Sequence, residues 1–256
     1  MTSQSLMRVD NVSVYQLLAF VLLLVLLSSW LLSNISNIQF ISRRFFPGKQ
    51  NTVLLVGPAN AGKTALLHFL RHGVDVATVT SMKENDCSIS LHSTLKTTPD
   101  TKQLHIIDFP GHERLRNRVF EFTPITSKIV FLVDAADRKS WRSAAEYLHD
   151  LFSNPKLNDL APPILIACNK MDQSSSASSQ CIQKTLEHEL TQLKSTRVSM
   201  ETHDQSHFDQ ETTSVPVGRE GSAFTFETDS PCECTFTDCS VKSRDIQDII
   251  VFICTK

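Results

Sequence analysis

The chain has 256 residues, which is enough for one sizeable domain with additional segments. Its formal net charge is −2, so no global basic field points to nucleic acid, and we expect no direct sequence-specific nucleic-acid binding. Seven scattered cysteines, an odd number, favour a reducing compartment over a disulfide framework.

The first recognisable element is an uncharged apolar run of 21 residues at positions 12–32. As a helix rising 1.5 Å per residue it would span about 31 Å, which matches a hydrocarbon core of about 30 Å. A cleaved signal peptide is the competing interpretation, but its apolar core is usually only about 7–15 residues long. The run therefore predicts a retained, single-pass membrane anchor.

The charges that flank this run predict its orientation. Arg43, Arg44 and Lys49 follow it, whereas Arg8 and Asp10 precede it. By the positive-inside rule, everything after the anchor faces the cytosol. The predicted organisation is a short lumenal N-terminus at 1–11, the anchor at 12–32, a cytosolic tether at 33–50 and a folded domain at 51–256.

The folded domain begins with a motif that predicts phosphate binding. An apolar run at 53–56 precedes the loop GPANAGKT at 57–64, and a helix-like segment follows it. Strand, GxxxxGKT loop and helix are typical of a phosphate-binding loop, in which backbone N–H groups and the helix dipole face the anion. We expect Lys63 to sit between the terminal phosphates and Thr64 to bind Mg²⁺. The candidate nucleotide-binding residues here are Gly57, Pro58, Ala59, Asn60, Ala61, Gly62, Lys63, Thr64 and Ala65.

Beyond this loop, strand and helix patterns alternate. Two strands at 87–95 and 102–108 form a predicted hairpin. Further strands are expected at 129–134, 163–168 and 234–239, and helices at 65–73, 140–152, 181–193 and 244–253. Continuous apolar runs suit strands buried on both faces of a parallel sheet. The sequence therefore predicts a three-layer α/β fold of the small-GTPase type, with a mostly parallel sheet and one antiparallel hairpin.

Two further segments lie between the predicted helix at 181–193 and the predicted strand at 234–239. Residues 195–221 are polar and lack periodicity, which predicts a disordered surface loop inserted into the domain. Residues 223–226, with the sequence AFTF, alternate as a strand would.

A DxxG motif lies at the end of the second hairpin strand, at positions 108–111. Asp108 is expected to hold Mg²⁺ through water, and the Gly111 N–H to meet a terminal phosphate. An NKxD motif at 169–172 then selects the base. Guanine presents an N1–H and an exocyclic amine to the Asp172 carboxylate, whereas adenine lacks this pair of donors. These motifs predict GTP or GDP with Mg²⁺ as the ligands.

The other residues of the expected base site have supporting roles. Asn169 would brace its loop, and the stem of Lys170 would cover the base. After the last strand, the segment CSVK at 239–242 contains an SxK element that includes Ser240. There we expect the Val241 N–H to meet the guanine carbonyl and Lys242 to pack over the base.

These motifs resemble those of one family within the Arf/Sar-like small GTPases, the beta subunits of the signal recognition particle receptor. The segment DFPGHERLR at 108–116 is similar to that family's DxPGHxxLR, and IACNK at 166–170 and DIQD at 245–248 also resemble it. The resemblance covers residues 12–195 and 222–253. It implies residence in the endoplasmic reticulum membrane. It also implies a tight complex of the GTP-bound domain with the receptor's alpha subunit, which docks ribosome–nascent-chain complexes at the translocon.

Two site residues depend on comparison with other GTPases. His112 stands where many small GTPases place the glutamine that orients the attacking water. Histidine could still position water, or it could only order the loop. Because its donor and acceptor geometry differs from that of glutamine, we expect slow intrinsic hydrolysis. Thr78 and Thr80 are the candidates for a loop threonine that reaches Mg²⁺. The triplet at 80–82 resembles the family's Thr-Ser-Ile, which favours Thr80.

Three functional hypotheses follow. The first is a cycling regulatory GTPase that recruits a receptor subunit. The second is a GTP-loaded scaffold with negligible hydrolysis, which His112 in place of glutamine favours. The third is an Arf-like trafficking GTPase unrelated to translocation.

Overall fold

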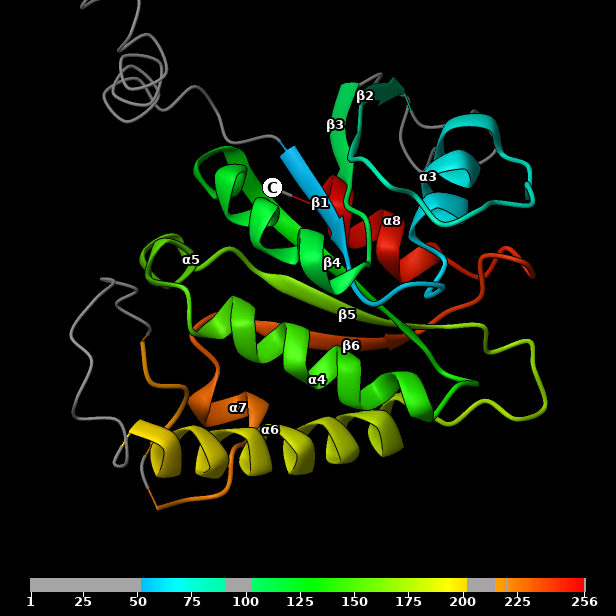
Figure 1. The fold of residues 1–256 in the computed structure, drawn as a ribbon. Helices are drawn as coiled ribbons and strands as arrows, with labels where there is room; N and C mark the ends of the chain where they lie inside the picture. Colours follow the sequence, from blue (N-terminus) through cyan, green and yellow to red (C-terminus); the bar gives the residue numbers. More distant parts are fainter. Residues whose placement is uncertain (1–51, 91–102, 202–214, 220, 256) are drawn as a thin grey trace, which may run out of the picture. The chain divides into compact units, whose positions relative to one another are not determined.

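One six-stranded sheet organises the folded domain (Figure 1). In this computed structural model, residues 52–90, 103–201, 215–219 and 221–255 are described. The strand order is β2-β3-β1-β4-β5-β6. The strands are β1 (Thr52–Val56), β2 (Asn85–Ser90), β3 (Gln103–Asp108), β4 (Thr126–Asp134), β5 (Ile164–Asn169) and β6 (Cys234–Asp238). Strands β2 and β3 pair antiparallel and the other neighbours pair parallel, which confirms the predicted mostly parallel sheet.

Helices cover both faces of the sheet and complete the three predicted layers. The cluster with Val53 and Leu55 of β1 includes α3 (Lys63–His72) and α8 (Gln247–Cys254). The opposite cluster, with Leu54 and Val56, includes α4 (Lys139–Phe152), α5 (Pro155–Leu160) and α6 (Ser179–Glu201). Successive strand residues point to opposite faces, so burial of both faces requires the continuous apolar run seen in the sequence.

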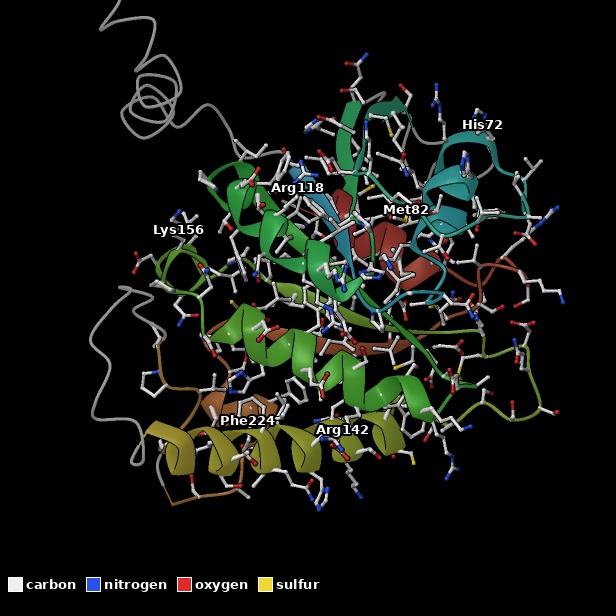
Figure 2. All side chains as sticks on the ribbon, viewed as in Figure 1. His72, Met82, Arg118, Arg142, Lys156 and Phe224 are labelled. Atoms are coloured by element: carbon white, nitrogen blue, oxygen red, sulfur yellow. The ribbon has the colours of Figure 1, made fainter. Side chains whose placement is uncertain are left out.

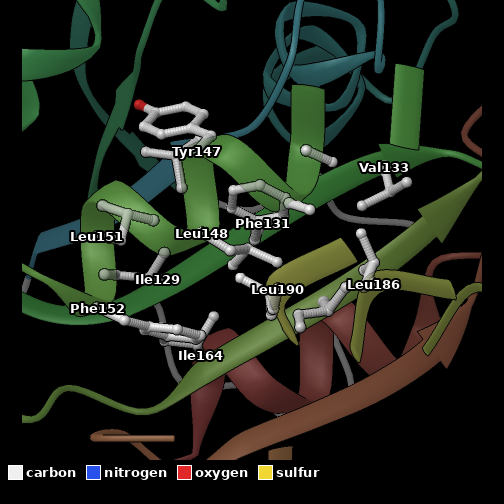
Figure 3. Close-up of a cluster of buried hydrophobic side chains, with 14 of the residues drawn as sticks. Ile129, Phe131, Val133, Tyr147, Leu148, Leu151, Phe152, Ile164, Leu186 and Leu190 are labelled. Atoms are coloured by element: carbon white, nitrogen blue, oxygen red, sulfur yellow. The ribbon is translucent and has the colours of Figure 1, made fainter. Parts of the chain in front are cut away.

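The core between the sheet and helices α4 and α6 is closely packed (Figure 3). Phe131 of β4 meets the ring of Tyr147 edge-on, with 5.7 Å between the ring centroids. Leu186 and Leu190 of α6 are buried in the same cluster. This packing fixes the ends of β4 and β5, from which site residues project.

The structure corrects the prediction for residues 195–221. Helix α6 continues to Glu201, so the beginning of the expected loop is helical. The residues added to the helix include neither proline nor glycine. A polar residue such as Thr196 is accommodated, because its hydroxyl donates to the Gln192 carbonyl one turn earlier. Residues 202–214 and 220 lie outside the described part of the chain.

The predicted strand at residues 223–226 is also wrong. Phe226 begins a short helix, α7 (Phe226–Asp229). Both phenylalanines enter one aromatic cluster, in which the Phe224 centroid lies 6.0 Å from that of Phe152 and 5.3 Å from that of Phe226. Figure 2 labels Phe224 beside α7. The alternation therefore reflects a shared aromatic cluster and not a strand.

The predicted anchor and tether at residues 12–50 lie outside the described residues. Within the described ranges, no helix combines the length and apolar character that a membrane crossing requires. The chain divides into two units, Met1–Lys49 and Gln50–Lys256, and the described residues all belong to the second.

Candidate nucleotide-binding site

The predicted motifs meet at one edge of the sheet. They follow the carboxyl ends of β1, β3, β5 and β6, four strands that share one direction. A pocket of about 80 Å³ opens among the first loop, residues 78–81 and residues 109–111. In doubly wound sheets, ligands bind outside this edge. Thr78 and Thr80 both line the pocket.

The first loop is shaped by a close approach to the NKxD loop. Gly62 adopts φ 98° at the start of α3, and a Cβ there would lie 2.3 Å from Nδ2 of Asn169. Only glycine combines this left-handed conformation with that contact. A second close approach occurs at Gly111, where a Cβ would lie 2.4 Å from the Ala59 backbone nitrogen. Glycines therefore let the DxxG and NKxD loops pack directly on the phosphate-binding loop.

Lys63 is held inside that loop. Its side chain is buried, and Nζ donates to the carbonyls of Gly57 at 3.0 Å and Pro58 at 2.7 Å. Burial lowers the pKa of Lys63 from 10.5 to about 8, although the Asp108 carboxylate opposes this shift. The ammonium thus lies where the loop backbone converges, as the phosphate-binding role requires.

Asp108 is the centre of the candidate metal side. This carboxylate is fully buried, and its Oδ2 accepts from the Thr64 hydroxyl at 2.7 Å and from Nδ2 of Asn85 at 2.9 Å. The Ser81 and Thr64 hydroxyl oxygens are 3.1 Å apart. Oδ1 of Asp108 is buried with no hydrogen-bond partner among the described residues.

These residues fit Mg²⁺, which prefers oxygen ligands and keeps several waters. Thr64 offers a hydroxyl, and the unpartnered Oδ1 of Asp108 offers a buried acceptor of the kind a metal-bound water would satisfy. The neighbouring Lys63 ammonium suits an anionic phosphate.

Asn169 links the loops of the expected base side. Its Nδ2 donates to the Ala61 carbonyl at 2.9 Å, and its Oδ1 accepts from the Val241 N–H at 3.1 Å. The brace predicted for Asn169 is thus present as two hydrogen bonds. The Val241 N–H, expected to meet a base carbonyl, has this partner within the protein.

Asp172 and Ser240, both expected at the base side, are joined by a hydrogen bond. The Ser240 hydroxyl is buried and donates to Oδ1 of Asp172 at 2.7 Å, while Asp172 itself is exposed. The serine also accepts from the Ser243 N–H at 3.1 Å. One carboxylate oxygen is therefore fixed, and the carboxylate is presented at an open edge.

The Lys170 ammonium has a partner that the sequence did not indicate. Its Nζ lies 2.6 Å from Oδ2 of Asp134, the buried last residue of β4. Lys170 itself adopts a left-handed backbone with φ 71°. The ion pair holds the ammonium against the sheet edge and so restricts where the stem of the lysine lies.

His112 does not line the pocket. It is exposed and stands at the N-cap of the 3₁₀ helix η2 (Glu113–Glu121), where its Nδ1 accepts from the Arg114 N–H at 3.3 Å. This geometry matches the alternative in which His112 orders the loop.

The remaining predicted residues lie as follows. Ala65 is half-buried on α3, and Lys242 is exposed after β6. Ala59, Asn60, Gly62, Lys63, Thr64, Thr80 and Gly111 line the pocket, and Gly57, Pro58, Ala61, Asp108, Asn169, Lys170, Asp172, Ser240 and Val241 enter the hydrogen bonds and ion pair described above.

Three residues with clear contacts in the site were not predicted. Asp134 has a sequence signal, because it ends a buried strand as Asp108 and Asn169 do. Asn85 and Ser81 have no such signal, since their contacts depend on the pairing of β2 with β3 and on the course of the preceding loop.

Comparisons with known proteins identify a family and several structures to which this chain is similar. The family model described as "Signal recognition particle receptor beta subunit" matches residues 48–229. The human signal recognition particle receptor subunit beta is 35% identical over 210 residues, covering 78% of this chain and 74% of its own. The structure of the mammalian SRP receptor aligns with a TM-score of 0.64 at 31% identity, covering 79% of this chain and 97% of that one. The Chaetomium thermophilum SRb-GTP/SRX complex shares the fold, with a TM-score of 0.56, 22% identity and coverage of 79% and 96%.

Proposed function

The chain belongs to the signal recognition particle receptor beta subunit family, and from this premise we propose that it is the receptor's membrane-anchored GTP-binding subunit. In its GTP state the domain would bind the receptor's alpha subunit. It would thereby help to bring ribosome–nascent-chain complexes to the translocon of the endoplasmic reticulum.

The observation that carries the nucleotide assignment is the pairing of Asp172 with Ser240 across two loops. A carboxylate with one oxygen fixed at an open edge can accept from both donors of guanine. The domain binds GTP or GDP with Mg²⁺, whose charge offsets that of the phosphates. Thr64 and Asp108 would hold the metal, and Lys63 the phosphates, as their contacts support.

The surface beside the pocket supports a protein partner. In the loop after α3, Val79 is 89% exposed and Met82 is 69% exposed, and Val79 also lines the pocket. Val74 and Val76 are further exposed apolar residues of this loop, and Figure 2 labels Met82 there. Exposed apolar side chains on a loop that reaches the nucleotide pocket suit a partner that binds only one nucleotide state.

The proposed location follows from residues 12–32. Their uncharged length fits a single membrane crossing, and the basic residues after them favour a cytosolic domain. In this arrangement residues 1–11 are lumenal, residues 33–50 form the tether, and the domain operates on the cytosolic face of the endoplasmic reticulum.

The position of His112 favours a subunit in which GTP acts mainly as a structural ligand. His112 is exposed and caps η2 instead of lining the pocket. We therefore expect slow hydrolysis by the isolated protein. Single-turnover hydrolysis, measured with and without the alpha-subunit domain and ribosomes, separates the scaffold from a cycling GTPase, because only the latter is accelerated.

The test of the proposed function changes the base that the domain accepts. Asp172→Asn replaces an acceptor with an amide that can donate, so the variant should prefer xanthine nucleotides. Capture of the full-length protein in detergent by the alpha subunit's N-terminal domain is then measured with GTP or XTP. We expect wild-type capture with GTP and variant capture with XTP.

The matched control is Asp159→Asn, which changes an exposed aspartate on α5. It should behave like the wild type with both nucleotides. Capture that is the same with GTP, XTP or no nucleotide contradicts a nucleotide-gated partner, and capture of coat proteins instead of the alpha subunit supports the Arf-like alternative.

A further inference from the structure

The structure brings Asn85 to the candidate metal side of the pocket. Asn85 begins β2, and the antiparallel register places it directly opposite Asp108, the last residue of β3. From that position its Nδ2 donates to Oδ2 of Asp108 at 2.9 Å. Asn85 belongs to none of the sequence motifs. Its contact with Asp108 arises from the pairing of β2 with β3.

The two oxygens of the Asp108 carboxylate have different surroundings. Oδ2 accepts from both Thr64 and Asn85, whereas Oδ1 is buried without a hydrogen-bond partner in the described part of the chain. A carboxylate removed from water needs donors to remain charged. Donors gathered on one oxygen orient the group and leave the other oxygen as its available acceptor.

The two groups that donate to Oδ2 of Asp108 differ in their other contacts. The oxygen of Thr64 is the expected metal ligand, so its orientation depends on the metal. The amide of Asn85 is neutral and its Nδ2 makes one further contact, a long one of 3.5 Å to the Ser81 hydroxyl. Asn85 can therefore hold Asp108 in one orientation whether or not the threonine turns toward a cation.

A purely structural role for Asn85 fits less well. The residue is exposed, and β2 lies at the edge of the sheet. An exposed side chain at a strand end adds little to the stability of a fold, whereas its hydrogen bond to a fully buried carboxylate acts directly on that group.

We propose that Asn85 is a positioning residue for Mg²⁺: its amide fixes Oδ2 of Asp108 so that Oδ1 faces a metal-bound water. This role rests on the proposed guanine-nucleotide function and deepens it. Asn85 would act through Asp108 and would contact neither metal nor nucleotide.

The test separates metal-dependent from metal-independent nucleotide retention. Dissociation of a fluorescent GDP analogue from the full-length protein in detergent is followed over a titration of free Mg²⁺ and again in excess EDTA. Asn85→Ala should raise the Mg²⁺ concentration for half-maximal retention about tenfold, as expected for loss of a hydrogen bond to a charged group. The dissociation rate in EDTA should stay within about twofold of the wild type.

A second comparison tests whether Asn85 acts through Asp108. In an Asp108→Asn background, Asn85→Ala should cause no further change in the Mg²⁺ requirement. The control Ser90→Ala alters an exposed residue at the far end of the same strand and should match the wild type.

The outcomes separate a failure of this inference from a failure of the proposed nucleotide-binding function. If Asn85→Ala leaves the Mg²⁺ requirement unchanged, or raises the EDTA rate by the same factor, Asn85 is not a positioning residue. If the wild-type protein retains no guanine nucleotide at any Mg²⁺ concentration, the proposed function itself is wrong.

Discussion

Lys63 sits in an environment that opposes its charge. Its ammonium is buried, while carbonyl oxygens of the loop and the neighbouring Asp108 favour the protonated form. The resulting pKa of about 8 in the nucleotide-free domain lies close to physiological pH. An anionic phosphate would stabilise the ammonium and raise this pKa, so nucleotide binding is linked to protonation.

We predict that nucleotide affinity falls as the pH rises through about 8. Below this pH Lys63 is already protonated, and above it binding must take up a proton. The unfolded chain keeps its ordinary lysine pKa of 10.5, so between pH 8 and 10.5 it binds more protons than the nucleotide-free folded state. The stability of that state should therefore rise with pH across this window, in the direction opposite to the affinity.

Calorimetry in two buffers of different ionisation enthalpy measures the linked proton. Uptake should be small at pH 7 and approach one proton at pH 9. The exposed Lys156, labelled in Figure 2, offers the control Lys156→Met, which should leave proton uptake unchanged. Binding enthalpies that do not depend on the buffer at pH 9 would contradict the linkage.

At the residue scale, the sequence predicted those site residues that belong to contiguous motifs. Lys63, Asp108 and Asp172 each lie in a short pattern whose chemistry is local: Lys63 begins α3 after β1, Asp108 ends β3, and Asp172 follows β5. Asn85 and Asp134 act on residues distant in the sequence. Their contacts depend on strand register and helix packing, which local composition does not determine.

At the element scale, an ion pair joins the two loops that border the pocket. Glu84, at the end of the loop after α3, accepts from Nη2 of Arg118 on η2 at 2.7 Å. A hydrogen bond within Glu84 and the contact with Arg118 both lower the pKa of this carboxyl, the first contributing more. The ion pair therefore connects the two loops.

We predict that Arg118→Ala loosens both segments. Amides of residues 74–84 should exchange with deuterium roughly two- to fivefold faster, the range expected for a partly exposed pair, although the substitution lies on the other loop. Hydrogen-exchange mass spectrometry measures this. Arg142→Ala is the matched control, because Arg142 pairs with Glu146 inside α4. If only residues near Arg118 exchange faster, the two loops are not coupled.

The sequence predicted elements best where burial imposes a pattern. The strands next to the phosphate-binding loop, and α4 with its apolar spacing, were found within a few residues of their bounds. The sequence pattern ends helix α6 too early because its last turns are polar, and it predicts a strand at 223–226, just before α7, because two phenylalanines alternate there. In both cases the tertiary environment decides, and the local pattern is insufficient.

At the scale of the whole molecule, we predict that the anchor and the nucleotide site are separable. Residues 1–45 precede β1, whose buried residues begin the described domain. Deletion of residues 1–45 should leave the affinities for GTP and GDP within about twofold of the wild type. It should remove stable membrane association, because the uncharged run at 12–32 is lost. Flotation with endoplasmic reticulum microsomes and nucleotide titration check both parts. A deletion variant that still floats to the same extent would contradict a single anchor.

The links made by Asn169 have a consequence for nucleotide exchange. Because its side chain ties the phosphate-binding loop to the loop after β6 through the protein's own atoms, these two loops keep their spacing without help from a guanine ring. We therefore expect that GDP can leave without unfolding of either loop, and that GTP binds to loops that are already in place. Binding of nucleotide to the empty domain should proceed at a rate set by collision and nucleotide concentration. Release of GDP is then the step that an exchange factor would have to accelerate.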